Sequence, residues 1–261
     1  MSNVRTVSDT KRAFYNNFDR PVTSVYRRVI EELMVEMHLL SVSGDFVYDP
    51  IYALGIVTTF DKFMEGYRPE GDTETIFTAL CKSVESTPEQ YRQDAQYALS
   101  TVDGMSLDDL KGLLSNLSEA NDEGLAGILK SVAAHERFKY SRAFGIGFYT
   151  LTDQIAPDLV KDKEALMEFM REAADALGIS FDKLQKDIEL YRSNLDKMVQ
   201  AKALMAEVLE AERKKREERA QAKAEQDKAA TAAETNQSAP AESTEPVTTP
   251  ASEGEDQPPS S

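Results

Sequence analysis

The residue types that most often catalyse reactions or bind metals are few in this chain. It has 261 residues, with two histidines, His38 and His135, and one cysteine, Cys81. Neither histidine shows the Glu-x-x-His spacing of di-iron bundles or the His-Glu-x-x-His spacing of zinc proteases. A single cysteine excludes an intramolecular disulfide and a cysteine-based zinc site. We therefore expect no metal site, and we expect Cys81 to be a buried thiol on an apolar helix face.

Nucleophile and phosphate-binding motifs are equally weak. No serine stands in a Gly-x-Ser-x-Gly pattern. Gly145-Ile146-Gly147 matches half of a dinucleotide-binding loop but lacks the third glycine and a preceding strand. These glycines, with Gly124 and Gly127, are better explained by close approach of helices. The sequence therefore predicts no catalytic residue and no cofactor. The alternative, an enzyme, would require a polar pocket in which titratable groups converge.

The charge balance narrows the classes of partner. Asp and Glu number 46 against 30 Lys and Arg, which gives a net charge of −16. Such an acidic chain repels nucleic acid and is not strongly attracted to anionic lipid. Residues 1–10 carry no secretion or organelle signal, and no stretch is long and apolar enough to span a bilayer. Residues 143–152 are uncharged and apolar, which fits either a buried core helix or, less well, a shallow interfacial contact.

Apolar residues recur at helical spacing through most of the chain, and no segment alternates like a strand. We predict an all-α fold, a multi-helix bundle in residues 1–179. The helix that starts at Asp49-Pro50 and is stopped by Gly66 and Pro69 is apolar nearly all round and is expected at the centre of the core. Start signals are expected at Ser8, Asp49 with Pro50, Asp72, Thr87 with Pro88, and Ser106 with Asp109.

A long helix is predicted for residues 180–230, which contain no Pro or Gly. Its apolar stripe, from Phe181 to Leu209, must pack on the bundle or on a second copy of the chain. Packing on the bundle is the preferred interpretation, so the chain is expected to be a monomer. The second half is rich in Glu, Lys, Arg, Gln and Ala and should project into solvent. Residues 231–261, with five prolines and six acidic residues, are predicted to be a disordered tail.

A helical protein of this kind is more suited to binding a partner than to catalysis. We predict partner contacts on two basic surfaces chosen for expected exposure. One is on the second helix, at Tyr26, Arg27 and Arg28. The other is on the long helix, at Arg213, Lys214, Lys215 and Arg216. A self-supporting solvated helix is the alternative for the second surface. A dimeric coiled coil formed through Phe181–Leu209 is a separate alternative for the whole chain.

Several separated segments resemble the Thylakoid Formation family of photosystem II biogenesis proteins. The resemblance covers residues 7–220. It is carried by VSDTKRAFY at Val7–Tyr15, the segment Pro21–Pro69, PEQYRQDA at Pro88–Ala95, FKYSRAFGIG at Phe138–Gly147, and Asp187–Arg219. Gly145 stands where the family pattern suggests Ala, and the acidic tail has no family pattern.

The resemblance implies an all-helical, non-enzymatic protein of oxygenic phototrophs. It implies a role in photosystem II assembly and repair, through association with membrane-bound FtsH-type AAA+ metalloproteases whose level it maintains. Contact with photosystem II components is also implied. The expected location is the cytoplasmic side of the thylakoid membrane, soluble or peripherally bound, in a cyanobacterial member. A dimeric helical scaffold for membrane or photosystem assembly, without protease contact, is the alternative.

Overall fold

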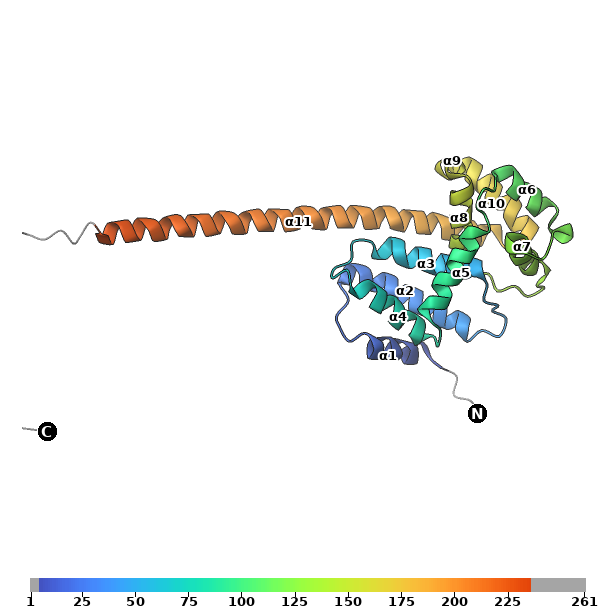
Figure 1. The fold of residues 1–261 in the computed structure, drawn as a ribbon, viewed down its shortest axis with the longest axis horizontal. Helices are drawn as coiled ribbons and strands as arrows, with labels where there is room; N and C mark the ends of the chain where they lie inside the picture. The colour runs from blue at the N-terminus through green and yellow to red at the C-terminus, as the bar shows by residue number, and fades with distance from the viewer. Residues whose placement is uncertain (1–4, 236–261) are drawn as a thin grey trace, which may run out of the picture. The chain divides into compact units, whose positions relative to one another are not determined.

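A computed structural model describes residues 5–235, and describes side-chain exposure for residues 5–223. The described residues form helices and connecting segments with no strand, so the predicted all-α class with a long C-terminal helix is confirmed (Figure 1). The prediction for the tail beyond residue 235 lies outside the described residues. The helices are α1 (Val7–Asn17), α2 (Ser24–Ser41), α3 (Pro50–Met64), α4 (Asp72–Ser83), α5 (Pro88–Ser100), α6 (Leu107–Ser115), η1 (Leu117–Glu119), α7 (Gly124–Ala134), α8 (Arg142–Ile155), α9 (Pro157–Lys161), α10 (Lys163–Leu177) and α11 (Phe181–Thr235).

The chain divides into two compact units, residues 1–201 and residues 202–261, and the boundary falls inside α11. The first turns of α11 therefore belong to the helical bundle. Their inward side chains are buried, namely Phe181, Leu184, Ile188, Tyr191 and Met198. The second unit contains the rest of α11, in which every side chain from Ala203 to Lys223 is exposed.

Helix α3 lies at the centre of the bundle, as its nearly all-round apolar sequence predicts. It packs most extensively against α8 and α5. Two apolar clusters form the core, and α3 contributes to both, with Tyr52 and Phe60 in one and Ile51 and Leu54 in the other. The apolar run of α8 is buried in this core, which favours the core interpretation of residues 143–152.

Glycine allows α3 and α8 to approach at van der Waals distance. A Cβ on Gly55 would lie 1.7 Å from the carbonyl oxygen of Ala143, and one on Gly147 would lie 1.9 Å from that of Ile51. The close approach predicted for Gly147 is confirmed. The role is different at Gly127, where an added Cβ would meet the preceding loop at Asp122.

Most predicted helix starts are correct. Asp49, Thr87 and Ser106 each accept a hydrogen bond from the backbone N–H three residues later, as N-cap side chains do. The prediction for Ser8 is wrong, because Thr6 caps α1 and forms a capping box with Asp9. Asp72 is also not a cap, because it lies inside α4 and pairs with Arg20 at 2.6 Å.

Candidate interaction surface

A junction between α2 and α8 organises one face of the bundle. Glu36 accepts hydrogen bonds from Nε and Nη2 of Arg142, at 3.0 and 2.8 Å, and from the backbone N–H of Ala143 at 2.8 Å. Ser141 caps the same helix by accepting from the N–H of Phe144 at 3.0 Å. The carboxylate thus lies where the positive end of the α8 helix dipole favours it. This junction fixes α2 beside the start of α8.

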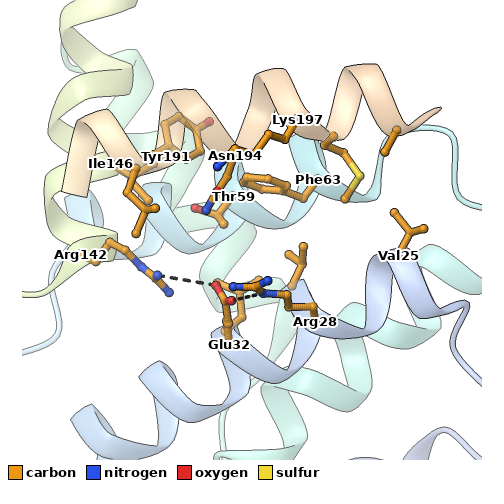
Figure 2. Close-up of a pocket in the computed structure, with 15 residues that line it drawn as sticks. Val25, Arg28, Glu32, Thr59, Phe63, Arg142, Ile146, Tyr191, Asn194 and Lys197 are labelled. Atoms are coloured by element: carbon orange, nitrogen blue, oxygen red, sulfur yellow. Dashed lines mark hydrogen bonds and ion pairs between the residues drawn. The ribbon is translucent and has the colours of Figure 1, made fainter. Parts of the chain in front are cut away.

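Next to the junction, α2 and the first turns of α11 border a groove of about 230 Å³ (Figure 2). Its inner surface is apolar and is provided by Leu33, Phe63, Ile146, Tyr191 and Met198. The rings of Phe63 and Tyr191 meet edge to face, with centroids 6.0 Å apart. Desolvation by burial is the main cause that raises the pKa of Tyr191, so its phenol stays protonated. The groove is therefore an apolar, aromatic depression on the bundle surface.

Charged side chains stand at the edge of this groove. Glu32 lies between two arginines, with Oε1 2.9 Å from Nε of Arg28 and Oε2 3.7 Å from Nη1 of Arg142 (Figure 2). From α11, Asn194 and the exposed Lys197 line the opposite wall. Lys197 has no ion-pair partner among the described side chains. The edge of the groove thus combines paired charges with Lys197, a cation that is unpaired within the described part of the chain.

The predicted contact residues on α2 differ in exposure. Arg27 and Arg28 are exposed, and Arg27 donates to the carbonyl of Val22 at 3.2 Å. Tyr26 is buried, and its ring packs edge to face on that of Tyr67 with centroids 5.0 Å apart. The prediction that Tyr26 is exposed is therefore wrong, because this residue belongs to the apolar face of α2. Of the three predicted residues on α2, the two arginines are the ones that a partner can reach.

The second predicted surface, Arg213–Arg216, is exposed on α11. Arg213 reaches Glu217 one turn later, with Nε 3.6 Å from Oε1. Four consecutive residues point around a helix rather than along one face, so only Arg213 and Arg216 share a side. The exposed side chains of Leu204, Met205, Val208 and Leu209 precede this basic run on the same helix. The segment from Leu204 to Arg216 thus presents apolar and basic groups together.

Of the residues considered for chemistry, Cys81 is buried as predicted, and the two histidines differ in burial. Cys81 is buried, and burial raises the pKa of its thiol to about 12, which makes it a poor nucleophile at neutral pH. His38 is buried, with Nδ1 2.8 Å from the hydroxyl of Thr10, whereas His135 is exposed. Within the described part of the chain, no group of three or more His, Cys, Asp or Glu side chains is placed to hold a metal ion.

Sequence reasoning selected Arg28, which lines the groove, but missed the side chains that surround it there. Glu36 and Arg142 are 106 positions apart, and a local pattern does not connect them. Thr59 and Lys197 also carried no distinguishing signal. The helical periodicity of α2 and α11 was the available indication, since it places Val25, Val29 and Leu33 on one side of α2 and Tyr191, Met198 and Ala201 on one side of α11.

None of the described helices is both long enough and apolar enough to cross a bilayer.

Comparison with known proteins agrees with the resemblance seen in the sequence. A family model described as thylakoid formation protein matches residues 6–220. A protein named Thf1 from Nostoc punctiforme is 55% identical over 222 residues, which cover 85% of this chain and 94% of that protein. Thf1 from Crocosphaera subtropica is 53% identical over 216 residues, covering 83% and 88% of the two chains.

A solved structure also matches. It is described as the structure of Psb29 at 1.55 Å, and it is 44% identical to this chain with a TM-score of 0.70. The match covers 81% of this chain and 98% of the solved one. Family model, sequence identity and fold agree over the described bundle, and the chain belongs to the thylakoid formation protein family.

Proposed function

We propose that this protein is a non-enzymatic auxiliary factor of photosystem II biogenesis and repair that binds FtsH-type protease complexes at the thylakoid membrane and maintains their level. Membership of the thylakoid formation protein family supports the setting. The protein acts from the cytoplasmic side of the membrane, soluble or peripherally bound, and photosystem II components are further candidate partners. It needs no cofactor for this role.

The observation that carries the proposal is the exposed apolar segment of α11. Leu204, Val208 and Leu209 are 62%, 51% and 63% exposed, and the basic run 213–216 follows them. Most helices in proteins owe their stability to the packing of an apolar face. A helix that leaves several large apolar side chains in water, beside a cluster of cations, has the composition of a docking surface.

Binding alone accounts for the proposed effect on a protease. A helper that binds the assembled protease more tightly than its separated subunits stabilises the assembly by mass action. The gain depends on the concentration of the helper relative to its dissociation constant, and no covalent step is required. The proposed contacts are the basic run 213–216 on α11 and two arginines of α2, Arg27 and Arg28. Tyr26 is no longer among them because it is buried.

Co-purification of the protease with the tagged full chain from thylakoid membranes tests this function. The double variant Lys214→Glu with Lys215→Glu reverses two exposed charges on α11 and should recover less protease. The matched control reverses two exposed lysines of the bundle, Lys62→Glu with Lys82→Glu, and should recover the normal amount. Equal recovery by both variants contradicts a role for the basic run.

The same exposed apolar residues also favour a second candidate function, a dimeric helical scaffold. Here Leu204, Val208 and Leu209 would pack on a second copy of α11 instead of on a protease. Sedimentation of the full chain separates the two. A monomer whose sedimentation coefficient does not change with concentration contradicts the scaffold and leaves the protease proposal in place.

A further inference from the structure

The groove between α2 and α11 contains a buried hydroxyl group with no partner. Thr59, on α3, lines the groove and is 8% exposed, yet its Oγ1 makes no hydrogen bond to any of the described residues. Two threonines of α8 satisfy their hydroxyls locally. Thr150 and Thr152 donate to the carbonyls of Ile146 and Phe148 at 2.8 and 2.9 Å. Oγ1 is itself covered, so a group that enters the groove can bond it once the Thr59 side chain turns to its other common helical rotamer.

The surroundings of Thr59 suit an aromatic ring. Phe63 and Tyr191 already form an edge-to-face pair, and Met198 adds a polarisable sulfur, which makes favourable contacts with ring edges. A cavity of about 150 Å³ binds benzene. The groove, at about 230 Å³, therefore has room for one substituted ring but not for a large fused-ring cofactor.

The charges at the edge favour an acidic neighbour for that ring. Arg28, Arg142 and Lys197 line the groove with one carboxylate, that of Glu32, while Glu36 binds Arg142 from outside it. Among the residues that line the groove, one carboxylate thus stands with three cations, and Lys197 has no ion-pair partner among the described side chains. This local excess of positive charge is notable in a chain of net charge −16. It selects for a partner segment that carries Asp or Glu close to its aromatic residue.

We propose that the groove binds a tyrosine side chain from an acidic segment of a partner protein, with the phenol hydroxyl bonded to Thr59 and a neighbouring carboxylate paired with Lys197. The proposal rests on the partner-binding role above and specifies what the bundle recognises. Tyrosine is favoured over phenylalanine because only its hydroxyl satisfies the buried Oγ1, and leaving that atom unpaired is costly. Buried tyrosines of this kind often dominate the energetics of an interface.

The test uses the purified full chain and three short peptides, so it does not depend on the protease. The probes are acetyl-Glu-Glu-Tyr-Leu-Glu-Glu-amide, the same peptide with Phe for Tyr, and one with Lys for every Glu. Binding is followed by the NMR chemical shifts of the groove residues during titration. We expect the tyrosine peptide to bind about fivefold more tightly than the phenylalanine peptide, as one added hydrogen bond allows. The lysine peptide should not bind.

Variants of two groove residues separate the ring from the charge. Thr59→Val keeps the shape and should abolish the preference for tyrosine, while Thr59→Ser keeps the hydroxyl and should retain it. Lys197→Gln should lower the affinity for the tyrosine peptide and for the phenylalanine peptide by the same factor. Equal affinity of wild type for the tyrosine and phenylalanine peptides, or no shift of groove resonances with either, overturns the proposal. Protease recovery that depends on Lys214 and Lys215 would stand in either case, so the two proposals fail separately.

Discussion

Glu36 on α2 and Arg142 on α8 form the most extensive hydrogen-bonded ion pair in the bundle face that borders the groove. Two hydrogen bonds join the side chains, at 3.0 and 2.8 Å, and a third joins Glu36 to the backbone of Ala143. Both side chains are largely buried, at 14% and 27% exposure. The pair therefore holds α2 against the start of α8 with less solvent screening than a surface ion pair.

Replacing Glu36 should destabilise the bundle more than replacing an exposed partner of the same network. Glu36→Ala leaves Arg142 and the N–H of Ala143 without their acceptor, and we expect a loss of about 2–3 kcal/mol in the free energy of unfolding. The exposed pair of Arg28 with Glu32 provides the control, since Arg28→Ala should cost less than about 1 kcal/mol. Urea unfolding monitored by circular dichroism measures both. Equal losses would mean that the α2–α8 junction has no special role.

Glycine substitutions should have opposite effects at two helical positions. Gly147→Ala places a Cβ 1.9 Å from the carbonyl oxygen of Ile51, which forces α3 and α8 apart and should cost about 3 kcal/mol or more. Gly112→Ala is the matched control in α6, where an added Cβ meets nothing within 4 Å. It should stabilise the protein by about 0.5–1 kcal/mol through higher helix propensity. Thermal unfolding of the two variants tests the pair, and stabilisation by Gly147→Ala would contradict the close packing of the two helices.

Local signals in the sequence predicted much of this fold because they act over a few residues. The caps at Asp49, Thr87 and Ser106 each involve a bond to the backbone three positions away, so residue type and spacing are sufficient to find them. The central place of α3 followed from an apolar sequence on nearly every side. The prediction of Ser8 as a cap was wrong because a competing local signal lies two residues earlier. Thr6 forms a capping box with Asp9 and starts the helix instead.

The groove could not be predicted in the same way, because its parts come from distant segments. Thr59, Arg142 and Lys197 are on three different helices, and their meeting depends on how those helices pack. Tyr26 shows the opposite case. It belongs to the buried repeat of Val22 and Ile30, four positions away on either side, so periodicity already opposed its selection as an exposed contact.

The stability of the bundle should fall in mild acid partly because of His38. Burial, with a smaller effect from Arg5, holds the pKa of His38 below its ordinary value of 6.5. As the pH falls through 6.5, the unfolded chain binds a proton that the folded chain still excludes, so the contribution of this group to stability is present above 6.5 and is lost below it. The free energy of unfolding of His38→Gln should change less between pH 7.5 and pH 5 than that of the wild type. Identical pH profiles would contradict the assignment, and His135→Gln, at an exposed position, serves as the control.

Asp49 should produce the opposite dependence on pH. Burial raises the pKa of this N-cap carboxyl to about 6, despite backbone hydrogen bonds from Tyr52 and Ile51 that lower it. The pKa of this carboxyl in the unfolded chain is near 3.8. Between pH 3.8 and about 6 the folded chain therefore binds the extra proton, and the contribution of Asp49 to stability falls as the pH rises.

Substitution of Asp49 tests this dependence, because Asn caps helices as well as Asp does but carries no charge. Asp49→Asn should therefore be more stable than the wild type by about 1 kcal/mol at pH 7, with the difference lost below pH 4. Asp49→Ala, which removes the cap itself, should be less stable than Asp49→Asn at every pH, and urea unfolding at pH 4, 6 and 7.5 distinguishes loss of the cap from relief of the buried charge.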